Sequence, residues 1–190
     1  MASTHPAVHR SDNLQIDTNF FLPVLMKRHF LQNGKGSARS SDFPRTTASV
    51  FPENSDLTYS ELAQISASKI VTLAAPFATP DQTIDNLIGG GRIPFDVNTA
   101  LVPAALRSIA LLANAGILEF NSALVNEYTQ VWEDSALEFF KISIPVSNAQ
   151  SLLENYATAF EVAGLQSQSE SLDSDVSFYA IAFEGNNNLS

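Results

Sequence analysis

Residues 99–115, TALVPAALRSIALLANA, decide the fold, because they form a helical pattern that is apolar on nearly every side. Thr99 is the preferred N-cap, which leaves Pro103 in the first turn, where a missing N–H costs nothing. Arg107 and Asn114 form the one polar stripe on this helix. A helix that is apolar all round lies at the centre of a bundle, so this stretch predicts a helical fold.

Capping and stop residues on both sides of this stretch mark further helices. Thr58 and Glu61 form a capping box for a helix that runs to Ala75, before Pro76. Similar patterns predict helices over 23–33, 79–88, 117–135 and 147–163. In the last of these, Ser147 and Gln150 form the cap, and the inward residues are Leu152, Leu153, Tyr156 and Phe160.

The periodicity changes after residue 139. Apolar residues alternate with other residues over 140–146, which predicts a strand, and 176–183 reads as a second strand buried on both faces. The predicted fold is mainly α: a bundle of about five helices, a small two-stranded β element near the C-terminus, and an extended N-terminal arm. The expected divisions are an arm over 1–50 with a short helix, a body over 51–184 and a tail over 185–190.

The charge of the chain is divided unevenly. Residues 1–45 hold six of the ten Lys and Arg residues against three Asp, whereas 46–190 hold four basic residues against seventeen acidic ones. Such a division predicts a basic arm attached to an acidic body.

The basic arm is the leading candidate for nucleic-acid binding. Its candidate contacts are Lys27, Arg28, Lys35, Arg39 and Arg45. Flexible cations of this kind neutralise phosphates and give binding that depends on salt. The alternatives are a solvated loop, or an arm that pairs with the acidic body of a neighbouring copy. Apolar residues in the arm, among them Phe30 and Phe43, indicate that it docks on another surface.

Arg107 is the sixth candidate contact with nucleic acid. A guanidinium on an apolar helix must either find a partner or extend to solvent. It could meet a phosphate in an assembly, but outward extension or pairing with a carboxylate of the bundle is the more common arrangement.

Several kinds of chemistry have little support. The chain has no Cys and its three His lie at positions 5, 9 and 29, so we expect no metal site, no cofactor and no enzyme activity. The stretch 89–92, GGGR, lacks the surroundings of a phosphate-binding loop and predicts a helix terminator and hinge. No apolar run is long enough to predict a membrane span, and no secretory signal is found, which predicts a virion or intracellular location.

The expected function is a structural subunit that assembles with copies of itself, most concretely a viral coat or nucleocapsid-type protein. Its expected partners are other copies, contacted through the arm, and single-stranded nucleic acid. The alternative is a helical module that binds a partner protein or a hydrophobic small molecule beside residues 101–115. An enzyme that uses two carboxylates ranks third.

Overall fold

The structure is a computed structural model that describes residues 16–50, 52–80, 82–83, 86–87, 92–94, 98–162 and 164–184. The longer helices are α1 (Ile16–Gln32), α3 (Tyr59–Ala74), α4 (Asn98–Asn114), α5 (Ser122–Ser135) and α6 (Val146–Ala159). Shorter helical elements are α2 (Gly34–Ser37), η1 (Phe43–Arg45), η2 (Pro52–Asn54), η4 (Glu138–Phe140) and α7 (Leu165–Ser169). The strands are β1 (Arg92–Pro94), β2 (Lys141–Ile144), β3 (Val176–Tyr179) and β4 (Ala182–Glu184). The predicted fold class, mainly helical with a two-stranded β element near the C-terminus, is confirmed.

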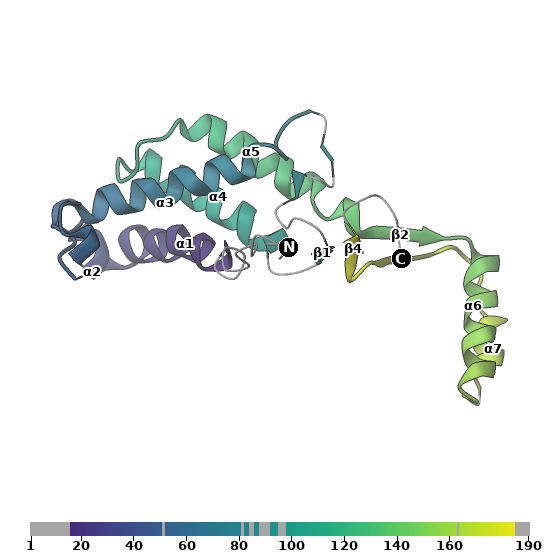
Figure 1. The fold of residues 1–190 in the computed structure, drawn as a ribbon. Coiled ribbons are helices and arrows are strands. Elements are labelled where there is room, and N and C mark those ends of the chain that lie inside the picture. Colours follow the sequence, from purple (N-terminus) through teal and green to yellow (C-terminus); the bar gives the residue numbers. More distant parts are fainter. Residues whose placement is uncertain are drawn as a thin grey trace, which may run out of the picture.

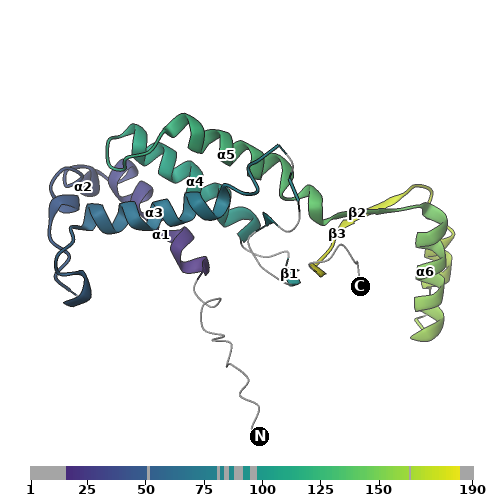
Figure 2. The same ribbon diagram turned by 45° about the horizontal axis from the view of Figure 1, so that its top comes forward.

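Helix α4 is the central helix of the body, as its all-round apolar pattern predicts. It runs alongside α1, α3 and α5 (Figure 1 and Figure 2). Val102, Leu106 and Ile109 of α4 are fully buried. The helix begins at Asn98, so Thr99 lies inside it and Pro103 is buried beyond the first turn rather than within it.

Helix α1 differs from its prediction in both length and place. It begins at Ile16, seven residues before the predicted start, and contains Pro23. Phe20 and Phe30 are buried, and α1 packs against α4. Burial of a Phe side chain contributes about 1.5–3 kcal/mol, which favours docking of this segment on its own body.

The loop after α2 is also attached to the body. Ala48 N–H donates to the carbonyl of Leu57 at 2.7 Å, and Tyr59 N–H donates to that of Thr46 at 3.0 Å. The part of the predicted arm over 16–50 is therefore packed against the helices, with residue 48 buried. Residues 1–15, the rest of the predicted arm, lie outside the described residues.

The predicted capping box of α3 is confirmed. Thr58 Oγ1 accepts a hydrogen bond from Glu61 N–H at 3.2 Å, and Glu61 Oε2 accepts one from Thr58 N–H at 2.7 Å. The Thr58 hydroxyl also donates a hydrogen bond to the Glu61 carboxylate. The bond from the Thr58 N–H, and to a smaller extent the bond from the hydroxyl, hold the pKa of Glu61 below its usual value. These bonds need the ionised carboxylate, because a protonated one accepts more weakly.

This capping box predicts a pH-dependent part of the stability. The pKa of Glu61 is lower in the folded chain than in the unfolded chain, so its contribution is present above the unfolded pKa and is lost as the pH falls through the folded pKa. We expect Glu61→Gln to lower the melting temperature at pH 7, by a margin that narrows in acid. Thermal unfolding of both proteins from pH 7 to pH 3 measures that margin, and a margin independent of pH would contradict the assignment.

A two-stranded ribbon leaves the end of the body and carries a separate helical head. β2 pairs antiparallel with β3, with Lys141 opposite Tyr179 and Ile144 opposite Val176. We call the segment between the two strands, residues 145–175 with α6 and α7, the head. In Figure 1 and Figure 2 the ribbon leads away from the body, and the head lies at its far end.

The C-terminal strand prediction is correct in type and wrong in detail. Residues 176–183 form two strands instead of one: β3 pairs with β2, whereas β4 pairs with β1. The predicted burial on both faces is wrong, because Phe178, Tyr179 and Ile181 are exposed. A narrow ribbon has no second layer to cover these side chains.

Two predicted helix starts are also corrected. Residues 117–120 form a loop, and α5 starts after Asn121, whose side chain accepts hydrogen bonds from the N–H groups of Ala123 and Leu124. At α6 the predicted Ser147 cap is replaced by Asp175, which accepts a bond from Val146 N–H at 3.1 Å. The predicted helix over 79–88 is wrong where the structure describes it, because residues 79–80, 82–83 and 86–87 form no α-helix. Of the GGGR stretch the structure describes only Arg92, which begins β1.

Candidate nucleic-acid interface and assembly surfaces

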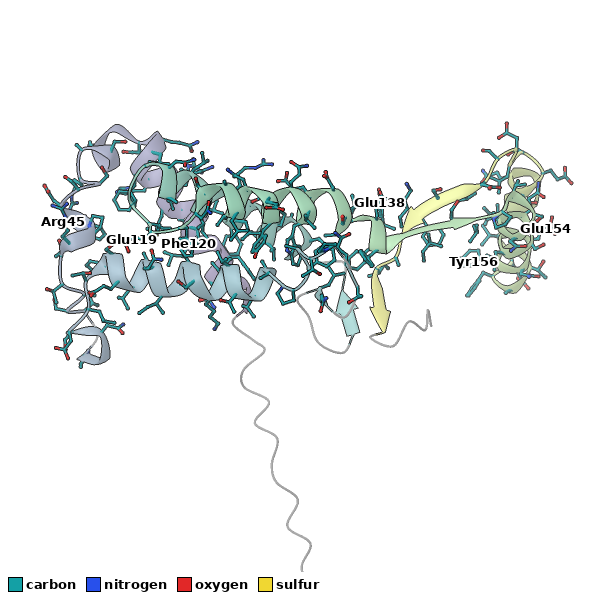
Figure 3. All side chains as sticks on the ribbon, turned by 90° about the horizontal axis from the view of Figure 1, so that it is seen from above. Arg45, Glu119, Phe120, Glu138, Glu154 and Tyr156 are labelled. Atoms are coloured by element: carbon teal, nitrogen blue, oxygen red, sulfur yellow. The ribbon has the colours of Figure 1, made fainter. Side chains whose placement is uncertain are left out.

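The five predicted cations of the arm gather at one end of the body. We call Lys27, Arg28, Lys35, Arg39 and Arg45 the basic end. They lie on the last turns of α1, on α2, just after α2 and in η1, and Figure 3 shows Arg45 at the end of the molecule opposite the head. Lys27 is half-buried and the other four are exposed.

The corner between α1 and α2 brings these cations together. The Asn33 side chain caps α2 by accepting hydrogen bonds from the N–H groups of Lys35 and Gly36 at 3.0 and 3.2 Å. Ser37 Oγ donates to the carbonyl of Phe30 at 2.8 Å. These local bonds fold α2 back on the end of α1, so that cations distant along an extended chain share one end of the body.

The charges of the basic end have no carboxylate partner among the described residues. Among the described residues the ion pairs are Arg107–Glu133 and Lys141–Glu138, and neither pair includes a residue of the basic end. Uncompensated exposed cations are the kind of surface that attracts phosphates or a carboxylate-rich partner.

A shallow groove of about 620 Å³, open to solvent, lies on the outer side of α1 at this end. Its lining residues are Leu25, Arg28, His29, Gln32 and Asn33. Guanidinium, imidazole and amide groups offer hydrogen-bond donors to phosphates and to the edges of unpaired bases. The groove is thus suited to a single-stranded nucleic acid.

The structure does not place Arg107 in the basic end. Its guanidinium forms an ion pair with Glu133, in the last turn of α5 before η4 and β2, and both side chains reach solvent. The Arg107 charge is therefore compensated within the chain, as the alternative from the sequence anticipated. An exposed pair of this kind contributes at most about 1 kcal/mol to stability.

An apolar cavity of about 240 Å³ lies at the same end of the body as the cations. Its lining residues are Leu22, Met26, Phe30, Phe43, Pro44, Tyr59, Ser60, Leu62, Ala63 and Ile117. They come from α1, η1, α3 and the loop after α4. We call this space the apolar cavity; no local pattern in the sequence identified it, although the apolar residues of the arm indicated docking.

Side-chain contacts define the shape of the apolar cavity. The rings of Phe43 and Tyr59 stack with centroids 4.7 Å apart, and Phe30 lies 6.1 Å from Phe43. Gln64 exchanges two hydrogen bonds with the backbone of Glu119, at 2.9 and 3.1 Å, which hold the loop after α4 against α3. These contacts within the chain hold the cavity wall together.

Helix α6 of the head, with its C-cap Phe160, exposes a row of large apolar side chains. Leu152, Tyr156 and Phe160 are 60, 53 and 66% exposed, so the prediction that they point inward is wrong. They recur every four residues and form one row, which we call the apolar row. Ala149 and Ala157 are the buried residues of α6, because α7 covers only that narrow side.

The described residues show no group of three or more His, Asp or Glu side chains that could hold a metal ion. Within the same ranges, no helix combines the length and apolar character needed to cross a membrane. The chain matches no protein-family model, and no curated protein and no solved structure matches it.

Proposed function

We propose that this chain is a structural subunit that assembles with copies of itself, most concretely as a viral coat or nucleocapsid-type protein that packages nucleic acid. In this proposal it acts in a virion, needs no cofactor and catalyses no reaction. The observation that carries the proposal is the head, which holds three large apolar side chains in solvent at the end of a ribbon. Full burial of such a side chain contributes about 1.5–3 kcal/mol, and burial of these half-exposed side chains against a partner would gain about half of that for each.

The basic end supports the second half of the proposal. Within the described ranges its cations have no carboxylate partner, and the groove beside Arg28 supplies donors for a single strand. In this proposal Arg107 remains a weaker candidate, because release of its charge to a phosphate would first require separation from Glu133.

Assembly is tested on the full chain. Sedimentation velocity and negative-stain imaging, with and without single-stranded RNA, should show oligomers whose size grows with protein concentration. A monomer at every concentration and salt, in the presence and absence of RNA, would rule the proposal out.

Nucleic-acid binding is tested separately, by reversing the charge of single residues. We expect Arg28→Glu to weaken binding of labelled single-stranded RNA several-fold and to reduce the salt slope, by about 0.7 for each phosphate that Arg28 neutralises. Lys69→Glu makes the same change on an exposed residue of α3, outside the basic end, and should leave the affinity nearly unchanged. Fluorescence anisotropy at several salt concentrations measures both; equal effects would indicate a net-charge effect without a defined groove.

A second candidate function is a module that binds a hydrophobic small molecule. The apolar cavity favours it, although the cavity lies between α1, η1 and α3 rather than beside the middle of α4. A lipid or similar molecule retained by a stable monomer in native mass spectrometry would support this alternative.

A further inference from the structure

We propose that the apolar row of one copy docks in the apolar cavity of the next, so that copies associate head to tail. The inference rests on the proposed function and names the surfaces through which it operates. The occupant of the cavity is thus a second copy of this chain, with Phe160 as the side chain that enters.

The two surfaces lie too far apart to meet within one molecule. Figure 3 shows Tyr156 and Glu154 at one end of the molecule, and Arg45, Glu119 and Phe120 at the other. Arg45 follows Pro44, and Phe120 follows closely on Ile117, and both of these neighbours line the cavity. The β2–β3 ribbon holds the head away from the body, so only another copy can bring an apolar row to this cavity.

The size and chemistry of the cavity match an aromatic ring. An engineered cavity of roughly 150 Å³ is enough to bind benzene, so about 240 Å³ holds one phenyl ring with some space around it. Phe30, Phe43 and Tyr59 supply rings against which a further ring can pack edge to face. Phe160 has no polar atom in its side chain and is the most exposed member of the apolar row.

The remainder of the apolar row would surround this anchor. The rings of Tyr156 and Phe160 lie with centroids 4.7 Å apart, so they present one continuous surface. Leu152, one helical turn before Tyr156, extends this surface. A central aromatic anchor surrounded by less deeply buried contacts is the usual arrangement of an interface hot spot.

The head is acidic, and the cavity has cations on the side formed by η1 and the residues before it. Residues 142–190 contain six carboxylates and no Lys, Arg or His. Glu161 directly follows Phe160 in the chain, and Glu154 lies on the same helix. At the cavity, the Arg39 guanidinium lies 5.4 Å from the ring centroid of Phe43, and Arg45 is adjacent to Pro44. Glu61 and Glu119 lie on the α3 side of the cavity, so the side of η1 is the one that attracts the head. An acidic head would therefore be attracted to the basic end and oriented on it.

This contact also determines the form of the assembly. The apolar row and the cavity are different surfaces, so each bound pair keeps one free row and one free cavity. Such a heterologous contact continues into an open filament or closes into a ring. The groove beside Arg28 faces a different side of α1 from the cavity and would stay available to nucleic acid.

Two full-length variants test the contact separately. Phe160→Ser removes the anchor from an exposed site, and Ser60→Phe fills the cavity with the chain's own ring. We expect each variant alone to weaken association about tenfold or more in sedimentation velocity without RNA. Ile65→Ser, which alters an exposed apolar residue of α3 outside both surfaces, is the matched control and should assemble as the parent does.

A mixture of the two variants gives the decisive measurement. Phe160→Ser keeps a working cavity and Ser60→Phe keeps a working apolar row, so an equimolar mixture should form dimers and stop there. A dimer also shows that both variants are folded. Parent-like assembly of either variant, a mixture that remains monomeric, or an equal loss in Ile65→Ser would overturn the inference.

The same experiment separates this inference from the proposed function. If the parent chain assembles and both variants assemble equally well, the head-to-tail contact fails while the self-assembling function stands. If the parent chain remains monomeric with and without RNA, both fail. A bound small molecule that occupies the cavity in assembled parent protein would overturn the contact alone.

Discussion

Gly36→Ala is expected to destabilise the fold by about 2 kcal/mol or more, whereas Gly34→Ala, two residues away in the same short helix, is not. A Cβ at position 36 would lie 2.0 Å from the carbonyl oxygen of His29 and 2.7 Å from its carbonyl carbon. These are backbone atoms of α1, so relief requires α2 to move away from α1. Overpacking of this kind costs about 1–3 kcal/mol and occasionally more.

Gly34 provides the matched control for this substitution. A Cβ there meets no atom within 4 Å, and the backbone is not in the left-handed region. Gly34→Ala should therefore leave stability unchanged or raise it by about 0.4–1 kcal/mol, through the smaller entropy of the unfolded chain. Urea unfolding followed by circular dichroism measures both variants, and equal midpoints would show that α2 does not pack on α1 as described.

Trp132→Ala should be the most damaging substitution in the body, with a loss of roughly 3–5 kcal/mol. Trp132 is almost fully buried, and its ring centroid lies 4.6 Å from that of Phe77. Its Nε1–H donates to the carbonyl of Ala74 at 3.0 Å, in the last turn of α3. Removal of the side chain leaves a large cavity between α3 and α5 and an unsatisfied buried carbonyl.

Trp132→Phe separates these two effects. It retains an aromatic ring but removes the donor to Ala74, and an unsatisfied buried acceptor costs about 1–3 kcal/mol. Leu124→Ala, at an exposed position of the same helix, should change stability by no more than about 0.5 kcal/mol. Trp132 is the one Trp of the chain, so its replacement removes the tryptophan fluorescence that would otherwise report unfolding. Unfolding of these variants should therefore be followed by circular dichroism. A loss for Trp132→Ala no larger than that for Leu124→Ala would contradict the packing of this core.

The functional surfaces could be predicted from the sequence only in part. The five cations stand out by their density in the first 45 residues, but their meeting at one end depends on the fold of α2 against α1. The partner of Arg107 is Glu133, 26 residues further along the chain. The apolar cavity draws its wall from four separate segments, so no single stretch of sequence reveals it.

The α3 cap and strand β2 are predicted correctly from local signals. The α3 cap depends on two residues three positions apart, and the alternation that predicts β2 spans a few residues. The position of α4 at the centre follows from its own composition, because an all-round apolar helix is stable only when other helices surround it.

Other features depend on contacts between distant residues, and these only the tertiary structure decided. The cap of α6 is the side chain of Asp175, which accepts a hydrogen bond from the N–H of Val146, 29 residues earlier in the chain. The sequence correctly indicates that α6 has one apolar face, but the exposure of that face follows from the position of the head beyond the reach of the body. Periodicity indicates that a helix has an apolar face. Which surface covers that face depends on where the fold places the other segments of the chain. In the head, no segment of the described chain covers the apolar row.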